Sequence, residues 1–158
     1  MTSITPCLWF DTEGEEAANF YTSVVKNSRI LNVTHYPEAA PGKAGSVLTV
    51  TFELDGQRFV ALNGGPQFSF TEATSFYIEC QTQEEIDEYW SRLSEGGEEG
   101  PCGWVKDRFG LSWQIVPARL MELIDDTDPE TSSRVMAAML QMGKIDLEAI
   151  EQAAAVTA

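Results

Sequence analysis

The chain has 158 residues, 43% of them hydrophobic, which is typical of one globular domain or of two fused halves that share a sheet. Ten basic residues against 25 acidic ones give a formal net charge of −15, which argues against binding to nucleic acid or to an anionic membrane surface. No apolar run reaches membrane-spanning length, and the first residues lack the basic and apolar regions of a signal peptide. We therefore expect a cytoplasmic protein.

The cysteines are three in number and widely spaced, at Cys7, Cys80 and Cys102. An odd count in strand-like segments does not suit a disulfide framework or a zinc site. We expect three reduced, buried thiols.

The first 66 residues predict the element order βαβββ. Thr12 and Glu15 fit a capping box, with the threonine hydroxyl on a backbone N–H at the start of a helix. Asp55-Gly56 is typical of a tight hairpin turn between two alternating strands. The strands of this unit are expected at residues 4–10, 29–36, 47–54 and 58–62.

The same pattern then repeats. A second capping box begins at Thr82, 70 residues after the first, and the helical apolar stripe recurs with an offset of 69. The stripe consists of Ala17, Phe20, Tyr21 and Val24 in the first copy and of Ile86, Tyr89, Trp90 and Leu93 in the second. Each copy alone would expose a sheet face. We therefore predict an α+β fold of two paired βαβββ modules, at about residues 1–66 and 73–117, which form one cleft.

The second module ends in a predicted hairpin over residues 103–117. On its second arm Leu111, Trp113 and Ile115 point to one face, whereas Ser112, Gln114 and Val116 point to the other. One polar amide on an otherwise apolar face usually lines a site, so Gln114 is the first candidate for a ligand contact.

After residue 117 the chain becomes helical, and residues 118–158 form a predicted C-terminal extension. A short helix is expected at 118–124, and Asp128-Pro129 is a strong start for the next one. Asp146 is the expected cap of a last helix that begins at Leu147 and ends near Ala155. An apolar stripe of Val135, Met136, Met139, Leu140 and Met142 indicates packing on the sheet module or on a partner subunit.

Several common catalytic patterns are missing from the sequence. It has no glycine-rich phosphate loop and no nucleophile elbow, and its element order does not give a doubly wound parallel sheet. His35 is the only histidine, which excludes a histidine-based triad or a two-histidine metal site within one chain. We expect His35 to be an ordinary surface histidine, and no residue is assigned a catalytic role.

A set of short segments carries a further signal, at residues 4–6, 20–21, 59–66, 102–104, 106–110, 112–117, 134–136 and 138–140. Together they resemble the vicinal oxygen chelate superfamily of glyoxalases, bleomycin-resistance proteins and extradiol dioxygenases. Within it they resemble the 3-demethylubiquinone-9 3-methyltransferase-like family. The resemblance implies paired βαβββ modules that curve into a half-open cleft, commonly completed by dimerisation, so we expect a homodimer.

The same resemblance implies that the metal site of the superfamily is lost. Metal-dependent members carry histidine or glutamate at positions that here hold Pro6, Ala61 or Phe59, and Ser75. Gln114 is where those members place a glutamate, but one neutral amide cannot hold a divalent cation against water. We expect no metal and no cofactor, since nothing in the sequence supplies a recognised site for adenosylmethionine.

The remaining cleft chemistry is aromatic with a few polar points. The candidate ligand-binding residues are Gln114, Asn63, Trp104, Trp9, Phe76 and Glu79, with Trp113 nearby. Aromatic walls with convergent polar groups suit a planar organic ligand, although they also suit a two-sheet core. The favoured function is binding of a small aromatic or quinone-like metabolite, with its transformation left open. The alternatives are a non-catalytic sequestration protein of the bleomycin-resistance kind and a genuine methyltransferase.

Overall fold

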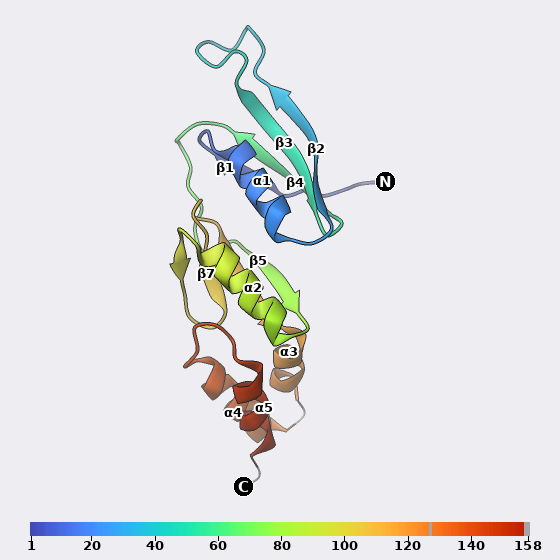
Figure 1. Ribbon diagram of the computed structural model, residues 1–158, viewed down its shortest axis with the longest axis vertical. Coiled ribbons are helices and arrows are strands. Elements are labelled where there is room, and N and C mark those ends of the chain that lie inside the picture. The colour runs from blue at the N-terminus through green and yellow to red at the C-terminus, as the bar shows by residue number, and fades with distance from the viewer. Residues whose placement is uncertain (127, 157–158) are drawn as a thin grey trace. The chain divides into compact units, whose positions relative to one another are not determined.

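The computed structural model describes residues 1–126 and 128–156, and the chain forms two compact units, Met1–Phe70 and Thr71–Ala158 (Figure 1). Each unit contains one four-stranded mixed sheet with a helix on one face, which confirms the predicted α+β fold of repeated βαβββ modules. Within the described residues no helix is long and apolar enough to cross a membrane.

The first unit consists of β1 (Cys7–Phe10), α1 (Gly14–Val24), β2 (Ser28–His35), β3 (Val47–Leu54) and β4 (Gln57–Asn63). Its strands are ordered β1-β4-β3-β2, with β1 parallel to β4 and the other pairs antiparallel. The buried side of α1, with Ala17, Tyr21 and Val24, faces a sheet core that includes Val50 and Phe52. The turn at Asp55-Gly56 has positive φ at both residues, which is the geometry of the predicted tight hairpin.

The start of α1 differs from the prediction. The helix begins at Gly14, its N-cap residue is Glu13 rather than Thr12, and the Glu13 side chain makes no capping hydrogen bond with the described residues. The free N–H of Gly14 is instead bound from a distance, by the side-chain oxygen of Asn63 on β4 at 2.8 Å. The predicted capping box at Thr12 is therefore wrong, because the side chain of Asn63, distant in the sequence, accepts the hydrogen bond that a local cap would accept.

The second unit repeats this topology with β5 (Ser75–Cys80), α2 (Gln83–Ser94), β6 (Glu98–Glu99), β7 (Trp104–Lys106) and β8 (Ser112–Pro117). Its strand order is β5-β8-β7-β6, and β5 runs parallel to β8 as β1 does to β4. Here the predicted cap is confirmed, since Thr82 Oγ1 accepts a hydrogen bond from the N–H of Glu85 at 3.2 Å. The Glu85 carboxylate accepts from the N–H of Gln81, one residue before the cap.

The two faces of the second sheet have different surroundings. The face that carries Val105, Trp113 and Ile115 is buried together with Ile86 and Leu93 of α2. The opposite face carries Trp104, Lys106, Ser112 and Gln114, because side chains alternate along β7 and β8 and the two strands pair Lys106 with Ser112 and Trp104 with Gln114. This second face carries the pocket described below.

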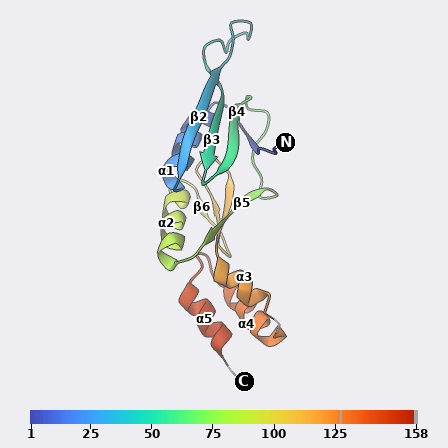
Figure 2. The same cartoon turned by 90° about the vertical axis from the view of Figure 1, so that its right-hand side faces the viewer.

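Three helices complete the second unit: α3 (Ala118–Ile124), α4 (Pro129–Met139) and α5 (Leu147–Ala155), which lie together beyond one end of its sheet (Figure 2). Asp128 and Asp146 cap α4 and α5 as predicted. The helices share one buried cluster with strand β8, formed by Val116, Leu120, Leu123, Val135, Ile145 and Ile150. The predicted methionine stripe is only partly buried, since Met136 and Leu140 remain exposed.

The side-chain amide of Gln83 joins the sheet module to the last helix. Its Nε2 donates to the carbonyl of Ile145 at 3.0 Å, and its Oε1 accepts from the N–H of Leu147 at 2.8 Å. The nearby ion pair between Lys144 and Asp87, at 2.8 Å, joins the same two segments. The start of α2 therefore fixes the start of α5.

The cysteines are free thiols, as predicted, but they are not all buried. Cys80 is fully buried, Cys102 is half-buried and Cys7 is exposed on the edge strand β1. The prediction of burial is wrong for Cys7 because a strand at the edge of a sheet leaves one side open to solvent.

Candidate functional site

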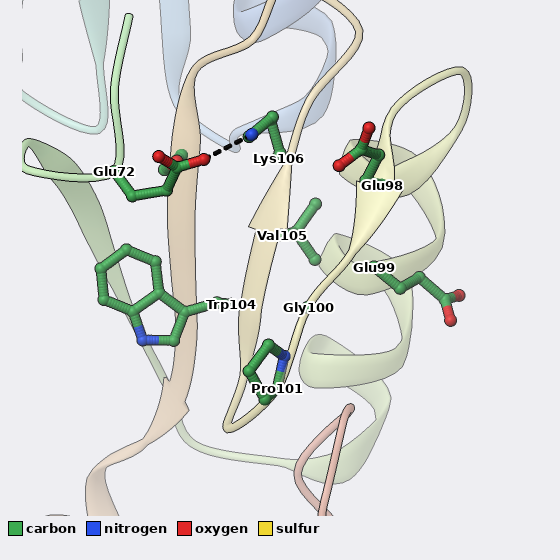
Figure 3. Close-up of a pocket in the computed structure, with 9 residues that line it drawn as sticks. Glu72, Glu98, Glu99, Gly100, Pro101, Trp104, Val105 and Lys106 are labelled. Carbon is green, nitrogen blue, oxygen red and sulfur yellow. Dashed lines mark ion pairs between the residues drawn. The ribbon is translucent and has the colours of Figure 1, made fainter.

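A pocket of about 370 Å³ lies on the second unit, beside the hairpin of β6 and β7. Its walls include the Trp104 indole, Lys106 and Ser112, with Glu72 and Glu98 at its edge (Figure 3). All of its lining residues belong to the same compact unit.

The sheet geometry brings these side chains together. Trp104 and Lys106 are two residues apart on β7 and therefore point to the same face, away from Val105 (Figure 3). Ser112 lies directly opposite Lys106 on β8, so its side chain emerges on that face as well. Gly100 leaves room for Trp104, because a Cβ at position 100 would lie only 3.3 Å from the Trp104 Cβ.

Ser112 is the most informative residue of the pocket. Only 1% of it is exposed, and its hydroxyl has no hydrogen-bond partner among the described residues. A buried polar group without a partner costs about 1–3 kcal/mol, so such a group in a folded protein calls for an explanation. Ser112 is one of the residues that line the pocket, so a turn of its side chain to another rotamer can bring the hydroxyl to a polar atom of a molecule bound there.

The pocket also carries an exposed ion pair between Lys106 and Glu72. The hydrogen bond from Lys106 lowers the pKa of the Glu72 carboxyl, and the same bond raises the pKa of the Lys106 ammonium. Glu98 lies opposite Lys106 on β6 and adds a smaller upward effect on the pKa of that ammonium. Lys106 therefore has carboxylates on two sides.

Asp107 holds the turn that places Lys106 and Ser112. Its carboxylate is 2% exposed and accepts hydrogen bonds from the N–H groups of Phe109 and Leu111, at 2.9 and 3.0 Å. The other carboxylate oxygen accepts from Trp113 Nε1 at 2.8 Å. This aspartate lies within the predicted hairpin over residues 103–117, but no role was predicted for it. Its signal is the spacing Asp-x-x-Gly, in which Gly110 adopts a φ of +88°.

Gln114 lies on the pocket face, and its Nε2 donates to Ser75 Oγ at 3.0 Å. It is two residues along β8 from Ser112 and pairs with Trp104 across the sheet. Glu79 is exposed near the far end of β5, where it pairs with Val116. Phe76 pairs with Trp113, and the two rings lie 5.6 Å apart on the opposite face, covered by α2.

The other two candidate residues belong to the first unit, where both make internal contacts. Asn63 is 8% exposed, and besides its bond to Gly14 it donates to the carbonyl of Val47 at 3.2 Å. Trp9 Nε1 donates to the carbonyl of Gly65 at 2.8 Å, and its ring meets Phe68 edge-on at 4.9 Å. The structure thus brings Trp104 and Gln114 together on one face, and it places Trp9 and Asn63 in a separate unit.

A second, more polar hollow of about 620 Å³ lies on the first unit. It is lined by Asp11, Glu15, Tyr36, Lys43 and Asn63, among others. Two of its polar groups already have partners: the Lys43 ammonium lies 5.1 Å from the centre of the Tyr36 ring, and the Tyr36 hydroxyl donates to the carbonyl of Asn63 at 2.5 Å.

The residues at the superfamily's metal position do not fit a metal. Gln114 offers a neutral amide and its neighbour Ser75 a neutral hydroxyl, whereas such sites need several anionic or imidazole ligands. Across residues 1–126 and 128–156, no group of three or more histidine, cysteine, aspartate or glutamate side chains could hold a metal ion. His35 lies exposed at the end of β2.

The two βαβββ units define the class of protein by its fold, which is an α+β fold of the glyoxalase and bleomycin-resistance kind. The family model described as 3-demethylubiquinone-9 3-methyltransferase matches residues 2–116, and the chain belongs to that family. A PhnB protein from Bacillus cereus with the same family description is 38% identical, with 74% of this chain and 100% of that one covered and a TM-score of 0.66.

More distant solved structures support the fold alone. Protein PA1353 from Pseudomonas aeruginosa is 19% identical over 74% of this chain and 98% of its own, with a TM-score of 0.63. The fosfomycin resistance protein FosX from Listeria monocytogenes is 16% identical over 77% of this chain and 97% of its own, with a TM-score of 0.52. No curated protein matches the chain.

Proposed function

We propose that this protein binds a small, planar aromatic or quinone-like metabolite in the pocket of its second unit, without a metal ion. The observation that carries the proposal is that Ser112 is one of the residues lining the pocket and that its buried hydroxyl has no partner among the described residues. A hydroxyl can donate to a carbonyl or phenol oxygen of such a ligand.

The remaining walls support the same ligand class. The half-buried indole of Trp104 lines the pocket and offers a flat apolar surface on which an aromatic ring can stack. The volume of about 370 Å³ lies within the range of about 300–1,000 Å³ that is usual for small-molecule sites. Gln114 provides a second polar group on the same face.

The test is a titration of the full chain with 2,3-dimethoxy-5-methyl-1,4-benzoquinone, in which tryptophan fluorescence reports binding. The Cys7→Ser background is used throughout, because an exposed thiol can add to a quinone. Ser112→Ala should weaken binding about tenfold, the loss expected for one hydrogen bond in a dry pocket. Ser91→Ala, on the exposed side of α2, is the matched control and should bind as the parent does.

Stability gives an independent reading of the same variant. Ser112→Ala removes a buried hydroxyl that has no partner among the described residues, so it should leave the melting temperature unchanged or raise it. Weaker binding with equal or higher stability supports the proposal. A destabilised Ser112→Ala protein with unchanged affinity, or no binding of the quinone to the parent, contradicts it.

One observation favours a second candidate, the sequestration of a cationic drug. Glu72 and Glu98 lie at the edge of the pocket, and the chain carries a net charge of −15. Thermal stabilisation by a cationic glycopeptide but not by the quinone would favour this function.

The family description also names a methyltransferase. Stabilisation by adenosylmethionine in the same screen would make methyl transfer the better proposal.

A further inference from the structure

Three different chemical groups meet on one small area of the second sheet. Lys106 and Ser112 are directly opposite across β7 and β8, which puts their Cβ atoms about 4.5–5.5 Å apart. Trp104 lies two residues before Lys106 on the same face, about 6.6 Å along the strand. A cation, a hydroxyl donor and a flat aromatic surface therefore lie within the span of one substituted benzene ring.

The cation of this group is already bound by a carboxylate of the same chain. Glu72, which precedes β5, forms an ion pair with Lys106 at the edge of the pocket. The side chains are 37% exposed for Lys106 and 61% exposed for Glu72. A pair this open is weak, because water screens it and both long side chains lose freedom in forming it. Another carboxylate can replace Glu72 at little cost.

The other acidic side chains at the pocket are placed differently. Glu99 accepts a hydrogen bond from Trp90 Nε1 of α2 at 3.0 Å, so its carboxylate is engaged on the helix side of the sheet. Glu98 faces Lys106 across β6 and β7 and remains beside it when Glu72 leaves. Lys106 is the single cationic side chain among the residues that line this pocket in the described part of the chain.

We propose that the ligand of this pocket is an aromatic acid, and that its carboxylate displaces Glu72 from Lys106 while its ring stacks on Trp104 and a polar substituent binds Ser112. Glu72 then acts as a built-in competitor that holds Lys106 in place when the pocket is empty. This inference rests on the proposed function, because it names the class of aromatic ligand that the same pocket takes.

The test uses two probes of nearly equal shape, 4-hydroxybenzoate and its neutral amide 4-hydroxybenzamide. Their dissociation constants are measured by calorimetry at pH 7.5 on the full chain, and the ratio of acid to amide affinity is the quantity compared. Glu72→Gln removes the competitor, so it should strengthen binding of the acid several-fold and leave binding of the amide unchanged. Lys106→Met should weaken binding of the acid about tenfold or more and change binding of the amide little.

Glu38→Gln is the matched control, since it removes one negative charge from an exposed loop of the first unit. An equal gain for the acid in Glu38→Gln and Glu72→Gln would show an effect of net charge alone and would overturn the proposal. If the parent binds the amide and neither pocket variant changes the ratio of acid to amide affinity, this inference is overturned. That result would leave the proposed function standing. Failure of every aromatic probe to bind the parent protein would overturn both.

Discussion

Asp107 determines the geometry of the pocket without lining it. Its buried carboxylate accepts three hydrogen bonds that close the turn between β7 and β8. Lys106 precedes it, and Ser112 follows the turn, so the spacing of the two pocket side chains depends on this one residue.

We expect Asp107→Asn to lower the free energy of unfolding by about 2–3 kcal/mol, because the amide turns a donor toward N–H groups that need an acceptor. Urea denaturation measures the loss. Asp55→Asn is the control, since asparagine suits the positive φ of 45° at that hairpin turn and should be nearly neutral. Equal stability of the two variants would show that the three hydrogen bonds of Asp107 contribute little.

Gln114 remains the residue that the sequence singled out most sharply. Its side-chain amide donates to the hydroxyl of Ser75, and the residue is half-buried on the pocket face. If it contacts the ligand, Gln114→Ala should cost about 1–3 kcal/mol of binding to the aromatic probe, since a polar group of the ligand is left without a partner. Stability should change little, because water can replace a partly exposed amide. A lower melting temperature with unchanged affinity would instead make it a structural amide.

Cys80 should make stability depend on alkaline pH. Burial, and then the nearby Glu85 and Glu79 carboxylates, raise the pKa of this thiol from 9.0 to about 12. The unfolded chain releases the proton near the ordinary pKa, whereas the folded protein retains it. The stabilising contribution is therefore complete below pH 9 and is lost as pH rises from about 9 toward 12.

We expect the free energy of unfolding to fall more steeply between about pH 9 and 11 in the parent than in Cys80→Ala. Denaturant titrations at a series of pH values measure the two slopes. Identical slopes for the parent and for Cys80→Ala would refute this linkage.

At the scale of elements, the two copies of the module start their helices in different ways. In α2 the Thr82 hydroxyl caps the helix, whereas in α1 the amide of Asn63 binds the first N–H from β4. Thr82→Ala should therefore lower the free energy of unfolding by about 1 kcal/mol, and Thr12→Ala should have almost no effect. Thermal denaturation of both variants is the measurement. A comparable loss of stability in Thr12→Ala would show that Thr12 caps α1 as Thr82 caps α2.

Most of the fold was predictable because periodicity and turn chemistry are local properties. The strands Val47–Leu54 and Ser75–Cys80 and the helix Ala118–Ile124 have the bounds that the sequence indicates. The cap of α1 was not predictable in the same way, although one signal was available: the apolar stripes repeat at 69 residues and the supposed boxes at 70. An offset of 69 from Thr82 leads to Glu13, which is the observed N-cap residue.

The site was harder to predict because its residues are distinguished by their partners. Asn63 and Gln114 are both strand amides that follow a large apolar residue in the sequence, Leu62 and Trp113. Only the folded chain shows that both ends of the Asn63 amide are bound, to Gly14 and to Val47. Ser112 could not be identified from the sequence, because a serine in a strand carries no signal of function. Its significance comes from the structure, where its hydroxyl is buried without a partner among the described residues.

At the scale of the whole molecule, the C-terminal helices belong to the core of the second unit. Ending the chain at Pro117 would remove Leu120, Leu123, Val135, Ile145 and Ile150, all of which are buried with Val116. Each such side chain contributes about 1.5–3 kcal/mol on burial, so their sum is comparable to the whole stability of a domain, about 5–15 kcal/mol.

We therefore expect the truncated chain to lose the tertiary structure of its second unit, seen as loss of the near-ultraviolet circular dichroism of Trp104 and Trp113. We also propose that the full chain is a homodimer, supported by three exposed apolar side chains: Met121 on α3, Met136 on α4 and Leu140 just after α4. Light scattering on the truncated chain distinguishes a role of the C-terminal helices in folding from a role in association. A folded monomer after truncation would show that the tail serves association alone.

The hydrogen bonds of Gln83 also bear on how the protein is made. During synthesis all strands of the first unit have left the ribosome once residue 70 has emerged, and domains generally fold in that order. The second unit has to wait, because the amide of Gln83 finds its partners only when Ile145 and Leu147 arrive, 62 and 64 residues later. Trp104, Lys106 and Ser112 are thus translated long before the helical cluster at the end of their sheet is complete. A stop codon anywhere in the last two helices would leave a chain with an incomplete second unit, which we expect the cell's proteases to remove.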